Sequence, residues 1–204
     1  MPTLLRELEF IGGMAALSIP LVLLSLAIPY AVLYMRDSRN EEHDPEIGLK
    51  SAMYFMFSLS IILILVGLTV IVIDFLMDEK GPAGAKSAGD FNEMQRLGAA
   101  MMVSGFAVGL FHLVVILGFT NDRRFPAARR VFLGWRLAIH SLVVLGAFTI
   151  LVVQVFQKDV NWDKLKPVFG VLLVWTPSWL AHLILIRYYR SAPIPRLRRS
   201  PLED

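Results

Sequence analysis

The sequence predicts an all-α integral membrane protein: a single bundle of five transmembrane helices with short loops and no soluble domain. Of its 204 residues, 56% are apolar and only 18% are charged, whereas soluble domains carry roughly 25% charged residues. Five apolar stretches are each long enough to cross the hydrocarbon core, which takes about 20 residues. These stretches use nearly all the apolar residues, so residues 1–204 are expected to form one membrane domain.

Polar, Gly-rich or Pro-containing segments separate the five stretches. The predicted spans cover about residues 11–35, 52–73, 97–119, 131–156 and 167–186, followed by a basic tail over 187–204. The first stretch is too long for a signal peptide and lacks a cleavage-type site, so it is expected to be a retained span. The helix of the second span should begin before residue 52, because Asp44-Pro45-Glu46 is typical of an N-cap followed by proline at the first helical position. The segment Glu41–Glu46 is otherwise expected to be a solvated acidic loop.

The distribution of basic residues predicts the orientation of the bundle. Twelve of the twenty Lys and Arg residues fall on one side of the predicted spans and seven on the other, while Arg136 lies within a span. The positive-inside rule then places the N-terminus outside and the C-terminus in the cytoplasm. The tail is expected to contact anionic lipid headgroups through five arginines: Arg187, Arg190, Arg196, Arg198 and Arg199. The net charge of +3 therefore reports orientation, and no nucleic-acid partner is expected.

Residue types and motifs that the sequence lacks exclude several classes of function. The chain has no cysteine, which excludes disulfides, thiolate nucleophiles and iron–sulfur clusters. It contains no nucleophile elbow, phosphate loop, HExxH motif or paired catalytic carboxylates. We therefore expect a non-enzymatic structural or accessory subunit that packs against other membrane chains or against itself.

Ionisable residues inside spans are costly and are candidates for function by default. The predicted spans contain five of them: Asp74, His112, Arg136, His140 and His182. At about 1.5 Å per residue, the three histidines fall roughly 7 to 14 Å below the inner boundary, each on a different helix. Arg136 and His140 are four residues apart and so share a helix face. The simplest arrangement buries these polar faces against one another.

Several chemistries would use such a cluster, and the sequence leaves them open. Two imidazoles could hold a haem b, or a histidine and Arg136 could hydrogen-bond a quinone. Three imidazoles and a water could hold a metal, and histidines could carry protons. The residues could also serve only as hydrogen bonds between helices. The cofactor-binding candidates are His112, Arg136, His140 and His182.

Asp74 supports a further alternative, because it lies near the outer end of the second span. It either marks the end of the hydrophobic zone or lines the pathway of a small ion or proton channel or transporter. Gly105 and Gly109 form a small-residue face on the third span, of the kind that lets two helix backbones approach closely. That face could pack within the chain or form a seam with a partner or a second copy.

In number of spans and in orientation, the chain resembles the haem-binding membrane anchor of respiratory nitrate reductases. In that family, two helices each supply a pair of histidine ligands. Here the span over 52–73 has no histidine and the span over 167–186 has only His182. The resemblance is therefore one of topology alone and assigns no haem ligand to this chain.

Overall fold

The computed structural model describes residues 26–39, 42–77, 92–122, 125–157 and 162–191. All regular structure in these residues is helical, and none of them forms a strand. Four helices are long and apolar enough to cross a membrane. They are α2 (Ile47–Met77), α3 (Glu93–Phe119), α4 (Ala127–Val155) and α5 (Trp162–Ser191).

The first predicted span lies largely outside the described residues. Within the described part, a helix covers residues 26–37, and this stretch is too short to count among the four long helices. It docks on the bundle through Leu33, which is fully buried in an apolar cluster with Phe132 of α4. The basic tail beyond residue 191 also lies outside the described part.

Helices α2 and α3 begin at capping residues, several residues before the apolar stretches begin. Asn92 starts α3 through a capping box: its side chain accepts from Gln95 N at 2.8 Å, and the Gln95 side chain accepts from Asn92 N. Asp44 caps the start of α2 as expected, since its Oδ1 accepts from Glu46 N at 3.0 Å. Helix α5 begins five residues before the predicted span and continues through Pro167. These helices therefore extend beyond the predicted spans at their N-terminal ends.

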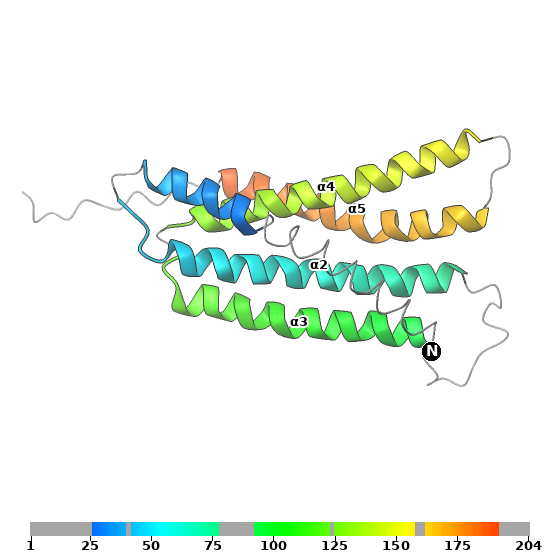
Figure 1. Cartoon of the computed structure of the whole chain (residues 1–204), viewed down its shortest axis with the longest axis horizontal. Coiled ribbons are helices and arrows are strands. Elements are labelled where there is room, and N and C mark those ends of the chain that lie inside the picture. Colours follow the sequence, from blue (N-terminus) through cyan, green and yellow to red (C-terminus); the bar gives the residue numbers. More distant parts are fainter. Residues whose placement is uncertain (1–25, 40–41, 78–91, 123–124, 158–161, 192–204) are drawn as a thin grey trace, which may run out of the picture.

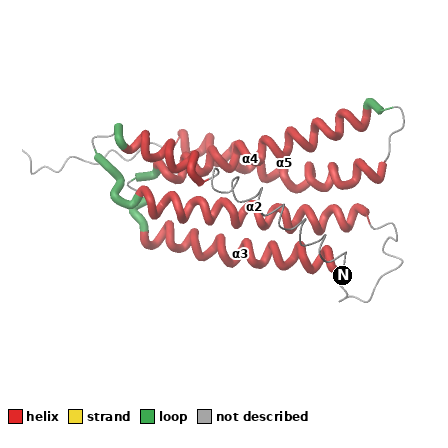
Figure 2. The backbone as a smooth tube through the Cα atoms, viewed as in Figure 1, coloured by secondary structure: helices red, strands yellow, loops and turns green. Residues whose placement is uncertain are grey.

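Helix α2 is the centre of the bundle (Figure 1). Among the described helices, α3 contacts α2 alone, while α4 and α5 pair with each other and both also contact α2. Consecutive helices of the four run antiparallel to one another (Figure 2). The fold is thus an α2–α3 hairpin and an α4–α5 hairpin that meet along α2.

Small residues bring α2 and α3 close together. A Cβ atom on Gly67 would lie 2.5 Å from the carbonyl oxygen of Gly98, and one on Gly105 would lie 2.8 Å from the carbonyl oxygen of Ser60. A Cβ on Gly109 would meet Ser60 Oγ at 2.6 Å. The face formed by Gly105 and Gly109 therefore packs within this chain, against α2.

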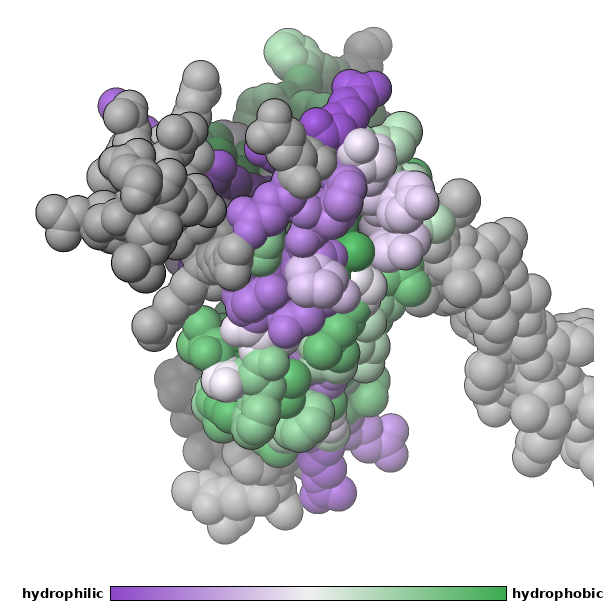
Figure 3. Space-filling model, turned by 90° about the vertical axis from the view of Figure 1, so that its left-hand side faces the viewer, coloured by the Kyte–Doolittle hydropathy of each residue, from purple (hydrophilic) through white to green (hydrophobic). Residues whose placement is uncertain are grey.

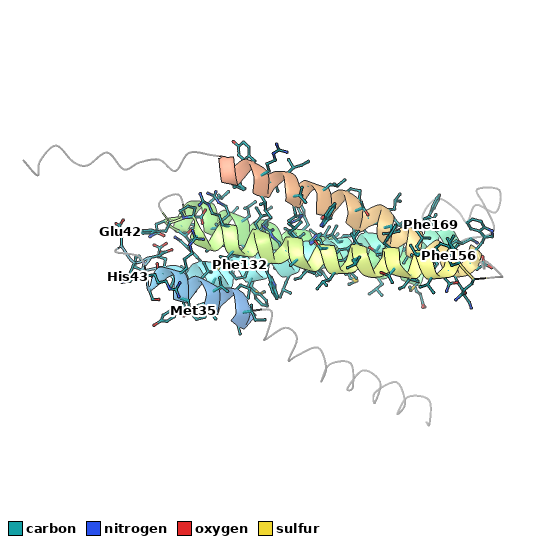
Figure 4. All side chains as sticks on the ribbon, turned by 90° about the horizontal axis from the view of Figure 1, so that it is seen from above. Met35, Glu42, His43, Phe132, Phe156 and Phe169 are labelled. Atoms are coloured by element: carbon teal, nitrogen blue, oxygen red, sulfur yellow. The ribbon has the colours of Figure 1, made fainter. Side chains whose placement is uncertain are left out.

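The outward faces of the helices are strongly apolar. Val103 and Phe106 of α3 and Leu142 of α4 have exposed fractions of 70%, 65% and 71%. The end of the molecule that faces the viewer in Figure 3 carries a group of hydrophilic side chains beside apolar ones. Glu42 and His43 lie at that end, whereas Phe156 and Phe169 lie toward the opposite one (Figure 4). An apolar belt of this kind is unfavourable in water and suits lipid contact.

The close approach of α2 and α3 predicts that Gly67→Ala is destabilising. Its Cβ would collide with a backbone oxygen that has no freedom to rotate away, so we expect the free energy of unfolding to fall by about 1–3 kcal/mol. The measurement is unfolding of the detergent-solubilised protein.

The matched control is Gly134→Ala, because a Cβ at Gly134 meets nothing within 4 Å. This variant should be as stable as the parent or up to about 1 kcal/mol more stable, since alanine favours the helix. Equal stability of the two variants would contradict the α2–α3 contact.

Candidate functional site

A cluster of buried polar side chains lies between α4 and α5. His140 is fully buried, and Arg136 and His182 are only 6% and 7% exposed. The ring centroids of His140 and His182 lie 4.5 Å apart, with the planes tilted by 38°. The Arg136 guanidinium lies over the ring of Phe57 on α2, 5.1 Å from its centroid. The structure thus brings together three of the four residues that the sequence singles out.

Hydrogen bonds fix the tautomer of both imidazoles in this cluster. Nδ1 of His140 lies 2.6 Å from the carbonyl oxygen of Arg136, and Nδ1 of His182 lies 2.8 Å from that of Ser178. A carbonyl oxygen only accepts, so in each neutral ring Nδ1 carries the proton and Nε2 carries the lone pair. Nε2 of His140 is buried and has no hydrogen-bond partner among the described residues. It is an acceptor in need of a donor.

The buried guanidinium of Arg136 also has a hydrogen-bond donor without a partner. Its Nε is buried without an acceptor in the described part of the chain. No carboxylate of the described residues forms an ion pair with Arg136. A buried charge without a partner is costly. The site therefore holds a buried donor, Arg136 Nε, and a buried acceptor, His140 Nε2, each without a partner among the described residues and four positions apart on α4.

Two tryptophans of α5 hold the histidine pair in position. Trp175 Nε1 donates to Thr69 Oγ1 of α2 at 3.0 Å, and Trp179 Nε1 donates to Ser141 Oγ of α4 at 2.8 Å. Trp175 also lies beside His140, with ring centroids 5.2 Å apart. These bonds anchor α5 on both neighbouring helices. The sequence indicates the shared face of the tryptophans but contains no signal for their hydroxyl partners.

His112 does not join the other two histidines. It lies on α3, which among the described helices contacts only α2, so α2 separates it from the α4–α5 pair (Figure 1). Its Nδ1 lies 2.7 Å from the carbonyl oxygen of Val108, and its ring meets Phe111 edge-on. The sequence predicts that three imidazoles meet, but in the structure only His140 and His182 do. Histidines at the same predicted depth in a bundle meet only if their helices are neighbours, and α3 does not contact α4 or α5.

The spacing of the histidine pair does not fit haem ligation. Two metal–nitrogen bonds of about 2 Å each already take up about 4 Å, and half the width of each ring must be added. The observed 4.5 Å between centroids leaves no room for an iron and a porphyrin plane. The described residues also contain no group of three or more His, Cys, Asp or Glu side chains placed to hold a metal ion.

Asp74 has a structural role in joining α2 to α3. Its Oδ2 accepts from Asn92 Nδ2 at 2.7 Å and from Gln95 Nε2 at 2.9 Å. Asn92 and Gln95 are the two residues of the capping box, so the carboxylate ties the end of α2 to the start of α3. This geometry accounts for the residue without an ion pathway.

A buried ion pair at the opposite end of α2 is absent from the sequence-based expectations. Lys50 Nζ lies 2.8 Å from Asp44 Oδ2, and the two side chains are 0% and 4% exposed. Lys50 Nζ also donates to the carbonyl oxygen of Phe125 at 3.2 Å, while Glu46 Oε2 accepts from Asn121 N at 2.8 Å. The prediction of a solvated loop is therefore wrong at Asp44, because its side chain is buried and paired with Lys50.

Of the five tail arginines, only Arg187 has a described side chain, and it is exposed on α5. The side chain of Arg190 lies outside the described part, as do residues Arg196, Arg198 and Arg199. Their expected contact with lipid headgroups stays a prediction.

Comparisons with family models, with curated proteins and with solved structures find no match. The class of protein is therefore defined by its own features. In its described part the chain is an all-helical protein with four helices suited to a membrane and a buried Arg–His–His cluster between two of them.

The Lys50–Asp44 pair predicts a large effect of removing one partner. Lys50→Met leaves Asp44 buried and unpaired, so the free energy of unfolding should fall by about 3–5 kcal/mol. Adding Asp44→Asn, which keeps an oxygen for Glu46 N, should recover part of that loss. Unfolding of the two single variants and the double variant measures the coupling, and strictly additive losses would contradict a buried pair.

Proposed function

We propose that this chain is a non-enzymatic, multi-pass membrane protein that acts as a subunit, packing against another membrane chain or a second copy of itself. The observation that carries the proposal is the position of His112. It lies seven residues before the end of α3, about 10 Å along the helix. Its ring is only partly buried, and no described residue pairs with its Nε2. A polar group at this depth is costly where it faces lipid, and a partner helix removes that cost.

His112 belongs to a polar edge of the α2–α3 contact, which we define as Ser104, Val108 and His112. These residues recur every fourth position along α3 and so form one line on its surface. Ser104 is exposed, and Val108 is 37% exposed. An imidazole and a hydroxyl along one edge offer hydrogen bonds to a neighbouring helix.

The proposal includes an orientation, with the N-terminus outside and the C-terminus in the cytoplasm. The excess of Lys and Arg on one side of the spans supports it. The turn between α3 and α4 then faces the cytoplasm, and the tail arginines meet anionic headgroups there.

Crosslinking from single cysteines tests the proposal, because the chain has no cysteine of its own. Val108→Cys on the polar edge, labelled in membranes with a thiol-reactive benzophenone, should capture a neighbouring chain on illumination. Val103→Cys, on the outward face of α3, should give several-fold less product. The mass of the product distinguishes a second copy from a different chain.

His112→Leu should weaken the same association, so that crosslinking from Val108→Cys falls. Equal yields from Val108→Cys and Val103→Cys, or no product from either, would overturn the proposal.

A second candidate function rests on the unpaired atoms of the Arg–His–His cluster. A quinol or other phenolic hydroxyl would donate to His140 Nε2 and accept from Arg136 Nε with a single oxygen. Binding of a membrane-soluble quinol is therefore the redox function that this geometry favours, and it requires no haem.

Ligand-induced stabilisation tests this candidate. An added quinol should raise the unfolding temperature of the purified protein by mass action, and His140→Phe should abolish the shift, provided circular dichroism confirms its helices. His112→Phe, which lies outside the cluster, should keep the shift. No shift in the parent protein, or an equal loss in both variants, would exclude a quinol site at His140.

A further inference from the structure

An open hollow of about 250 Å³ lies between α4 and α5 at the end of the bundle where α4 begins. Arg130 and Leu133 of α4 and Ile186 and Tyr189 of α5 line it. It combines one cationic side chain, one phenol and two aliphatic walls. Tyrosine and arginine are typical of the level of lipid headgroups.

Among the described residues, no carboxylate neutralises the positive charge of this hollow. Arg129 pairs with Asp122 at 3.6 Å and lies over the Tyr189 ring, 4.6 Å from its centroid. By contrast, no carboxylate of the described residues pairs with Arg130, nor with the buried Arg136 two turns further on. Arg130, the cation that lines the hollow, therefore has no carboxylate partner among the described residues, which favours an anion.

A second hollow, of about 350 Å³, lies deeper along the same pair of helices. Its walls are almost wholly apolar and comprise Ser141, Val144, Leu145, Phe148 and Trp179. The one polar group that α4 contributes to the lining of this hollow is the Ser141 hydroxyl. It already accepts from Trp179 Nε1 and donates to Leu137 O. The second hollow therefore fits a hydrocarbon chain.

The two hollows lie along one line. At 3.6 residues per turn, the α4 residues that line the two hollows fall within about one third of the helix circumference, which places them on one face of the helix. Gly134 adds an open position with nothing within 4 Å of its Cβ site. From Arg130 to Leu145 is fifteen residues, about 22 Å. That is close to the distance from headgroup to midplane in a bilayer of about 40–45 Å.

We infer that the groove between α4 and α5 binds one anionic phospholipid, with its phosphate at Arg130 and Tyr189 and an acyl chain in the hollow beside Trp179. Arg130 supplies the hydrogen bonds and charge that phosphate oxygens prefer. The aliphatic walls and Phe148 supply the apolar contact along the chain. This site goes beyond the proposed subunit function and does not depend on it.

Native mass spectrometry of the full-length protein tests the inference, with phosphatidylglycerol and phosphatidylcholine of the same chains added in detergent. The parent should retain one phosphatidylglycerol at least tenfold more tightly than phosphatidylcholine. Arg130→Gln should lose about tenfold in phosphatidylglycerol affinity, as expected for a charged hydrogen bond. Arg36→Gln, an exposed arginine of the helix over residues 26–37, should lose little.

Two further experiments test whether the deeper hollow holds an acyl chain and whether the bound anion is a phospholipid or free phosphate. Leu145→Trp fills the deeper hollow and should weaken both lipids, whereas Leu142→Trp, on another face of α4, should not. Inorganic phosphate at equal concentration should not displace the lipid. Equal retention of the two lipids, equal losses in Arg130→Gln and Arg36→Gln, or displacement by inorganic phosphate would overturn the lipid site.

Discussion

The described bundle depends on the double contact of α2. On one side its backbone approaches α3 so closely that Gly67 and Gly98 leave no space for a Cβ atom. On the other side Thr69 accepts the indole hydrogen bond of Trp175 from α5. Gly67 and Thr69 lie within one turn of α2. The same short segment of α2 therefore contacts α3 on one side and α5 of the second hairpin on the other. Each additional helix is positioned relative to this segment.

Polar groups inside the bundle divide into two kinds. Most of them are satisfied, including the Asp74 carboxylate at the start of α3 and the Lys50 ammonium near the start of α2. Arg136 and His140 each keep a buried atom without a partner in the described residues, as do Asn121, Asp122, Arg129 and Gln154. In a low-dielectric interior such atoms carry a penalty that packing alone does not remove. Among these residues, Arg136 and His140 are four positions apart on α4, and the ring of His140 lies against that of His182. This grouping is why the α4–α5 cluster suggests a ligand.

Hydropathy was sufficient to predict the four long helices, because each is a continuous apolar run of the length that a bilayer requires. It could not predict their neighbours. His112, His140 and His182 lie at similar depth, but only the order of helices around α2 decides which of them meet. The partners of Asp74 and Lys50 were equally hidden, since Asn92 and Phe125 belong to segments whose approach depends on how the hairpins close. Residue types therefore identified the candidate residues of the site, and the arrangement of the helices determined which of them come together.

Among the described helices, α3 contacts α2 alone, and this has a consequence for biogenesis. Because α2 and α3 are neighbours in the chain, their glycine-lined contact requires nothing that is synthesised later. The hydrogen bond from Trp175, in contrast, needs the last helix. During synthesis from the N-terminus, the first hairpin is complete as a unit before α5 leaves the ribosome, and the second hairpin then assembles onto a preformed wall.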